Sequence, residues 1–169
     1  MPSNLPAADD RCIAGILFAL SIEADLFARR VADEREWRGT GPTMHEGTLA
    51  GRRVAWCVTG VGADAAMQAA RLMLDGHHPL TLVSAGFAGG LHPTLPRGAV
   101  VRPGAVIDET GGARIALAAV GDGPAGPTLV SVAEPATTPD RKRELAARTA
   151  AAVVDMETHA VASAARSSL

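Results

Sequence analysis

Residues 80–91, with the sequence LTLVSAGFAGGL, decide the fold class that this chain predicts. The run 80–85 is short and apolar, which is typical of a strand buried on both faces. Three glycines follow it, and glycines let the backbone approach a ligand closely. In open α/β sheets the ligand crevice lies at the carboxyl ends of the strands. The stretch therefore predicts an α/β fold with a binding loop at 86–91, although a structural tight turn would also explain these glycines.

Strands and helices alternate on both sides of this loop. Because apolar strands that alternate with helices require a mostly parallel sheet covered on both faces, we expect a three-layer α/β sandwich. The segment 138–140 (TPD) offers a capping residue, a proline for the first helical position and a first-turn acid. We expect strands over 13–20, 48–49, 53–59, 80–85 and 153–155, helices over 22–32, 65–74, 139–149 and 157–165, and short extended segments between 98 and 132.

Length and composition indicate one domain. The 169 residues are 47% hydrophobic, so we expect a loose tail over 1–10 and a single domain over 11–169. With a net charge of -2, 3% aromatic residues and no tyrosine, a nucleic-acid partner is not expected. No apolar stretch approaches the ~20 residues that cross a bilayer. The sequence predicts a soluble, cytoplasmic protein.

Metal-binding and disulfide patterns are not found in the sequence. Cys12 and Cys57 have neither metal-ligand spacing nor a CxxC arrangement, which suits a reducing cytoplasm. The five histidines form no HExxH motif, so no metal is expected. The basic cluster Arg141-Lys142-Arg143 is expected to be a solvated helix face without a function.

Glu23 follows the first predicted strand. A carboxylate near a helix start and beside an apolar wall can have a tuned pKa and activate a water. The alternative is an ordinary first-turn acid that interacts favourably with the helix dipole.

Residues 59–65 (TGVGADA) satisfy the loose GxGxxA form of a dinucleotide fingerprint. NAD binding is disfavoured because the next strand leads into Gly86 and Phe87 rather than a ribose-binding acid.

Residues 154–162 (VDMETHAVA) place two acids around a methionine where a strand becomes a helix. Glu157 could accept two hydrogen bonds from a sugar diol while Met156 packs against the ring carbons. An ordinary first-turn acid is the alternative for Glu157.

Residues 86–91 and 154–162 together resemble the nucleoside phosphorylase superfamily, above all its methylthioadenosine/S-adenosylhomocysteine nucleosidases and hopanoid-associated phosphorylases. Residues 19–23 resemble the strand end with the catalytic glutamate of that family, and 60–65 resemble its GxG turn. The resemblance covers roughly 13–165. It implies the family fold, with a twisted, mostly parallel central sheet, and cleavage of an N-ribosidic bond.

The resemblance also implies roles for single residues. Glu23 would deprotonate the attacking water, Phe87, Ala88 and Gly89 would border the substrate, and Asp155, Met156 and Glu157 would hold the ribose. The implied substrates are adenosine-type purine nucleosides such as methylthioadenosine or S-adenosylhomocysteine. No cofactor is implied, with phosphate as co-substrate if the protein is a phosphorylase.

Two departures from the family pattern separate the hypotheses. Phe87 stands where nucleosidases commonly have a small hydroxyl residue. The family also continues beyond the ribose helix with a strand that bears the purine-protonating Asp, so a C-terminally truncated member, lacking the last strand and helix, is expected. A catalytically silent nucleoside-binding or assembly domain is therefore the alternative to an enzyme. Family members are often dimers, so a homo-oligomer is expected.

Overall fold

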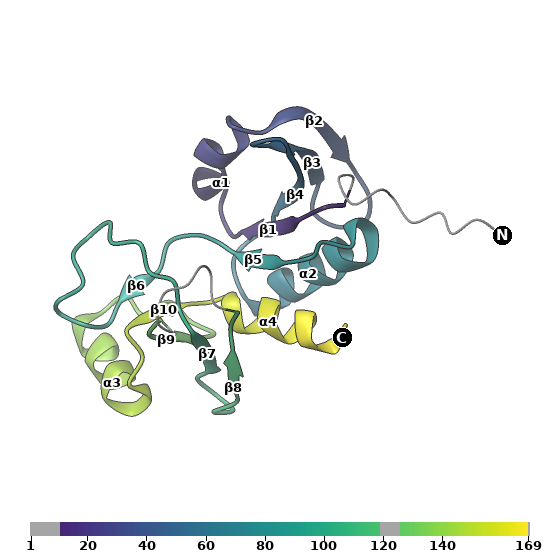
Figure 1. Cartoon of the computed structure of the whole chain (residues 1–169). Helices are drawn as coiled ribbons and strands as arrows, with labels where there is room; N and C mark the ends of the chain where they lie inside the picture. Colours follow the sequence, from purple (N-terminus) through teal and green to yellow (C-terminus); the bar gives the residue numbers. More distant parts are fainter. Residues whose placement is uncertain (1–10, 119–125, 169) are drawn as a thin grey trace.

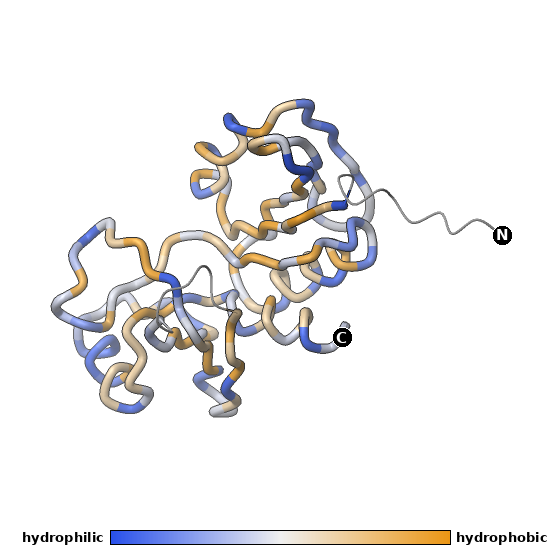
Figure 2. Tube along the Cα trace, in the orientation of Figure 1, coloured by the Kyte–Doolittle hydropathy of each residue, from blue (hydrophilic) through white to orange (hydrophobic). Residues whose placement is uncertain are grey.

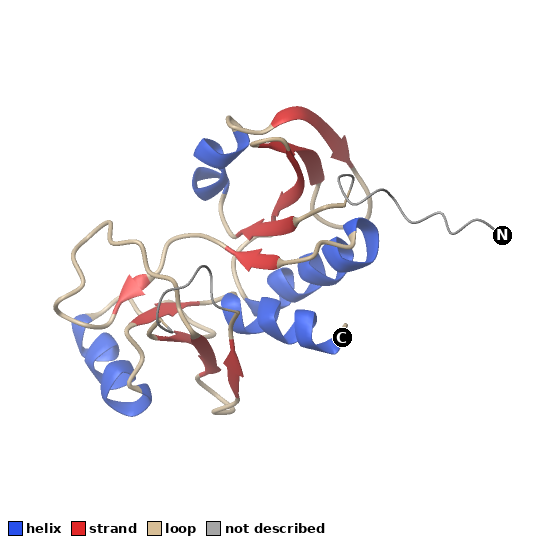
Figure 3. Cartoon of the chain, in the orientation of Figure 1, coloured by secondary structure: helices blue, strands red, loops and turns tan. Residues whose placement is uncertain are grey.

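Two five-stranded sheets form the centre of the molecule, as the computed structural model shows for residues 11–118 and 126–168 (Figures 1 and 3). The tail expected over 1–10 lies outside the described residues. The first sheet has the order β2-β3-β4-β1-β5. Its strands are β1 (Ala14–Phe18), β2 (Ala32–Trp37), β3 (Met44–Leu49), β4 (Arg52–Val58) and β5 (Leu82–Ser84).

The second sheet has the order β6-β10-β9-β7-β8 and follows the first one along the chain. It begins with the two-residue strand β6, which lies in the predicted binding loop. Its strands are β6 (Gly89–Gly90), β7 (Ala105–Asp108), β8 (Arg114–Ala116), β9 (Thr128–Ser131) and β10 (Val153–Asp155).

Both sheets are mixed, which corrects the prediction of one mostly parallel sheet. The central strands of each sheet run parallel: β4, β1 and β5 in the first, and β10, β9 and β7 in the second. The outer pairings β2–β3, β3–β4, β6–β10 and β7–β8 are antiparallel. Short connections join β2 to β3, β3 to β4 and β7 to β8, and a tight turn between neighbouring strands permits only an antiparallel pair. The α/β class itself is confirmed.

Helices cover the sheets on both faces. The helices α2 (Ala63–His77) and α4 (Thr158–Ser167) pack together, and buried alanines at 66, 69, 70, 160 and 164 let them approach closely. On the other face of the first sheet, α1 (Ser21–Ala28) contributes to a cluster with Phe18 and Trp56. The helix α3 (Pro139–Thr149) packs on the second sheet through the fully buried Leu145. Figure 2 shows the apolar character of β1, which this arrangement buries on both sides.

Several predicted elements agree with the structure to the residue. The helix α3 and the strand β10 have the predicted bounds, and the Thr138 hydroxyl accepts the Arg141 N–H at 3.2 Å as a helix cap. The strands predicted over 48–49 and 53–59 correspond to the longer β3 and to β4, which form a hairpin with Ala50 and Gly51 at φ 49° and 76° in its turn.

Two other elements differ from the prediction. The helix expected over 22–32 ends at Ala28, and the exposed strand β2 begins at Ala32. The sequence ADEREW of β2 has no buried face, so the period-2 pattern of a half-buried strand is absent. The helix expected over 65–74 continues to His77, and His78 follows it in the left-handed region, at φ 46°.

Candidate active site

Glu23 joins the end of the first strand to the glycine loop, which is residues 86–91. The parallel strands β1 and β5 pair Leu17 with Ser84, so their carboxyl ends lie side by side. Glu23 Oε2 accepts the Leu20 N–H at 2.9 Å, and Oε1 accepts the Phe87 N–H at 2.8 Å. Each carboxylate oxygen has a second acceptor position, so two positions remain for a ligand.

Gly86 is required for this contact. A Cβ atom at position 86 would lie 2.6 Å from Glu23 Oε1 and 2.8 Å from Cδ, closer than carbon atoms approach without displacement. The first glycine of the loop therefore makes room for the carboxylate. Phe87 contributes its backbone N–H, while its side chain is 72% exposed.

Glu157 joins the GxG turn to the second sheet. Its Oε1 accepts the Gly62 N–H at 2.6 Å, and its Oε2 accepts the Met156 N–H at 3.2 Å. Gly62 has φ 103°, a conformation that favours glycine. Burial raises the pKa of the Glu157 carboxyl, the Gly62 hydrogen bond opposes this, and the negative charges of Asp155 and Glu23 add to the increase. The three carboxylates therefore lie close enough to interact.

Asp155 is bound by hydroxyl groups of the fold. Its Oδ1 accepts the Ser131 hydroxyl at 2.6 Å, and its Oδ2 accepts the Thr158 N–H at 3.0 Å as well as the Thr158 hydroxyl. Burial raises the pKa of Asp155, and the hydrogen bonds from Ser131 and Thr158 oppose this. Because both oxygens already have internal donors, Asp155 holds the turn from β10 into α4. A direct contact of Asp155 with the substrate stays a prediction.

The glycine loop and the ribose-side segment are neighbours in the second sheet. The strand β6 pairs antiparallel with β10, and Gly89 lies opposite Val154. A Cβ atom at Gly89 would lie 2.9 Å from Val154 Cγ1, so a side chain there would displace the valine. Met156 packs on the cluster of Val130, Leu145 and Val154. The structure thus brings together Glu23, Phe87, Ala88, Gly89, Asp155, Met156 and Glu157 around one loop.

Sequence reasoning missed the groups that position these carboxylates. Gly62 belongs to the loose dinucleotide pattern and to the GxG turn of the resemblance, neither of which predicts its contact with Glu157, and no role is predicted for Ser131 and Thr158. Ser131 lies opposite both Asp108 and Asp155 at the carboxyl ends of three strands. A polar residue at the end of a buried strand was the signal that could have found it.

One group of possible metal ligands lies away from this site. Glu34, Glu36 and His45 offer ligand atoms within 4.8 Å of one another on the β2–β3 hairpin. These groups already have protein partners, because Glu34 pairs with His45 and Glu36 pairs with Arg38. The HExxH motif does not predict this group, because its side chains come from two different strands.

Within the described ranges, no helix is long and apolar enough to cross a membrane.

Carboxylates and a glycine loop at the carboxyl ends of parallel strands are the arrangement expected at the ligand crevice of an open α/β sheet. The family model described as the phosphorylase superfamily matches residues 13–138. This chain belongs to the phosphorylase superfamily, as the sequence analysis predicted.

Solved structures share the fold at low sequence identity. A methylthioadenosine/S-adenosylhomocysteine nucleosidase from Colwellia psychrerythraea 34H, in complex with adenine, is 21% identical with a TM-score of 0.79, over 93% of this chain and 77% of the other. An S-adenosylhomocysteine nucleosidase from Streptococcus pyogenes is 16% identical with a TM-score of 0.80, over 95% and 80%. A futalosine hydrolase from Helicobacter pylori is 15% identical with a TM-score of 0.78, over 92% and 79%.

Proposed function

We propose that this protein cleaves the N-ribosidic bond of adenosine-type purine nucleosides, with water as the nucleophile. The observation that carries the proposal is the proximity of two carboxylates beside one glycine loop. Glu23 accepts the Phe87 N–H, Glu157 follows β10, the strand paired with Gly89, and the charges of the two carboxylates interact. The loop therefore borders both a group suited to water and a group suited to a sugar.

Glu23 orients and deprotonates the water. Its two oxygens are fixed by the backbone N–H groups of Leu20 and Phe87, so the carboxylate cannot rotate freely. The remaining acceptor positions take a proton from water as its oxygen attacks C1′. A general base of this kind contributes about 10²- to 10⁴-fold in rate.

Glu157 binds the ribose diol. Its oxygens accept the Gly62 and Met156 N–H groups, and the positions left over accept two adjacent hydroxyls. Positive charge develops on the sugar as the bond to the base breaks, so hydrogen bonds to this carboxylate strengthen in the transition state. Asp155 supports Glu157 by fixing the turn between β10 and α4.

The names of the similar structures support the choice of substrate class. Two of the three described above are named as nucleosidases of adenosine derivatives, and one of these contains adenine. The test is release of adenine from methylthioadenosine and adenosine, followed by chromatography with and without phosphate. Release that does not depend on phosphate supports hydrolysis. If release requires phosphate, the nucleophile is phosphate rather than water. If no adenine is released, the protein does not catalyse this reaction.

A silent nucleoside-binding domain is the second candidate, because the exposed Phe87 side chain offers no hydroxyl to a water. Saturable binding of an adenosine analogue by calorimetry, without release of base, would support it.

We also propose a cytoplasmic homodimer that needs no cofactor. Ile22 and Leu26 of α1 are 66% and 69% exposed next to the site, which suits a covered surface. Light scattering measures the mass in solution.

A further inference from the structure

The chain contains a single lysine, Lys142, among sixteen basic residues. The other fifteen are arginines. Lysine differs from arginine in having a compact ammonium that can give up its proton to a neighbouring group. Among the lysine and arginine side chains of this sequence, Lys142 is therefore the one suited to proton transfer.

Lys142 differs from both of its neighbours in α3. Arg141 pairs with Glu109 and Glu144, and Arg143 pairs with Asp140. Lys142 has no ion pair or side-chain hydrogen bond within the part of the chain that the structure describes, and it is partly buried. Lys142 therefore differs from a fully solvated basic side chain in being partly buried without an acidic partner among the described residues.

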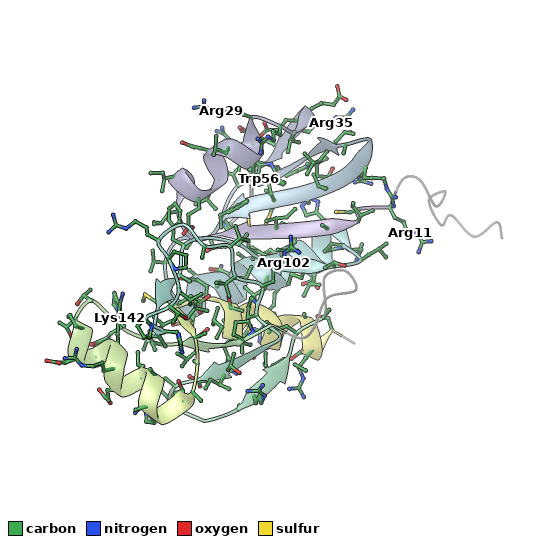
Figure 4. The ribbon with its side chains drawn as sticks, turned by 60° about the vertical axis from the view of Figure 1, so that its left-hand side comes forward. Arg11, Arg29, Arg35, Trp56, Arg102 and Lys142 are labelled. Atoms are coloured by element: carbon green, nitrogen blue, oxygen red, sulfur yellow. The ribbon has the colours of Figure 1, made fainter. Side chains whose placement is uncertain are left out.

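The ammonium of Lys142 lies over the glycine loop. A Cβ atom at Gly89 would be 3.7 Å from Lys142 Cε and 3.7 Å from Nζ, so the absent side chain leaves room for the lysine. Figure 4 labels Lys142 on α3. Gly89 pairs with Val154, from which the chain continues into Met156 and Glu157. The lysine thus lies beside the segment proposed to hold the ribose.

Two opposite charges therefore lie near the two ends of one short loop. Glu23 accepts the Phe87 N–H at one end, and the Cε and Nζ atoms of Lys142 lie next to Gly89 at the other. When water displaces a group from a sugar carbon, the water and the leaving group lie on opposite faces of the ring. A carboxylate suits the side of the water, and an ammonium suits the side where the base departs with an electron pair.

We infer that Lys142 binds the departing base and supplies its proton, an inference that rests on the proposed function. The bond between C1′ and the base nitrogen breaks, and its electron pair stays on the base. Lys142 Nζ donates a proton to the base, and the water that forms the new C1′–O bond gives a proton to Glu23. Solvent then removes the proton from Glu23 and returns one to Lys142, so the sum is nucleoside plus water to sugar plus base.

The test compares Lys142→Met with wild type on two substrates: adenosine and a nitrophenyl riboside, whose leaving group departs as a stable anion. Methionine keeps the length of the side chain and removes the charge. We expect kcat for adenosine to fall about 10²-fold or more, because a general acid contributes about 10²- to 10⁴-fold. We expect kcat for the nitrophenyl riboside to change less than about 3-fold, since a good leaving group gains little from general-acid assistance.

Two controls separate this role from a structural one. Added ethylamine should restore part of the adenosine activity of Lys142→Ala, because a free amine replaces the missing group. Arg143→Met, on the next helix position, should keep both activities. Equal losses on both substrates, or no loss, would overturn the inference while leaving the proposed function intact. A wild-type protein that releases neither leaving group overturns the proposed function, and this role with it.

Discussion

The two carboxylates of the candidate site follow strands of different sheets and are held in different ways. Glu23, in α1 after the strand β1 of the first sheet, accepts backbone N–H groups and needs the absence of a side chain at Gly86. Glu157, between β10 of the second sheet and α4, follows Asp155, which is fixed by the hydroxyls of Ser131 and Thr158. The position of Glu23, proposed to activate the water, therefore depends on backbone geometry, and the position of Glu157, proposed to bind the ribose, depends on a buried polar network.

Gly86→Ala should have the largest effect, because it removes the space that the backbone-held carboxylate occupies. The new Cβ would lie 2.6 Å from Glu23 Oε1 and displace it. We expect kcat for base release to fall about 10²-fold or more, the size of a lost general base. In the matched control, Gly76→Ala, the Cβ meets nothing within 4 Å, so activity should be unchanged. Full activity of Gly86→Ala would mean that Glu23 does not act from this position.

Glu157→Gln tests the ribose side. The substitution removes the charge that strengthens hydrogen bonds to the sugar, and such charge-assisted bonds contribute about 1.5–3 kcal/mol each. We expect kcat/KM to fall about 10- to 150-fold, the same energy expressed as a rate ratio. Glu134→Gln, on an exposed loop, is the control. Steady-state kinetics that do not distinguish the two variants would remove Glu157 from the site.

Asp155→Asn tests the buried network through the pH dependence of stability. Because burial raises the pKa of Asp155 in the folded state, the group favours folding below its ordinary range and loses this contribution as the pH rises through the raised pKa. The free energy of unfolding, measured with urea between pH 4 and 7, should therefore decline less with rising pH in the variant than in wild type. Asp25→Asn, at an exposed position of α1, should keep the wild-type slope. Identical slopes in all three proteins would contradict the burial argument.

Phe87→Ala should have the smallest effect. Only the backbone N–H of this residue contacts Glu23, and the ring is 72% exposed. We expect kcat to change less than about 3-fold, well below the loss of a general base. The contrast with the neighbouring Gly86→Ala sharpens the distinction between backbone and side chain. A loss as large as that of Gly86→Ala would show that the ring itself contributes to the reaction.

The sequence predicted those parts of the fold that local signals determine. The Thr138 cap and Pro139 fixed the start of α3, and the turn at Ala50 and Gly51 fixed the β3–β4 hairpin. The strand β2 was missed because its charged residues are held at a sheet edge by pairing with β3, which no local pattern encodes. The antiparallel pairs β2–β3, β6–β10 and β7–β8 were missed for the same reason.

The candidate site shows the same division. Glu23 and Glu157 were found because they follow predicted strands. Their partners were not found, since Gly62 donates to Glu157 across 95 residues and Phe87 donates to Glu23 across 64. For Lys142 the sequence predicts a place on a solvated basic face. Its position next to Gly89, which is distant in the sequence, is visible only in the fold.

The most direct test of the account is the rate of adenine release by Glu23→Gln, measured beside wild type and Asp25→Asn, a matched change on the same helix. The account predicts measurable release by wild type and Asp25→Asn, and a loss of about 10²- to 10⁴-fold in Glu23→Gln with the fold unchanged by circular dichroism. Equal rates in Glu23→Gln and wild type would contradict it, because the water side of the site would then lie elsewhere.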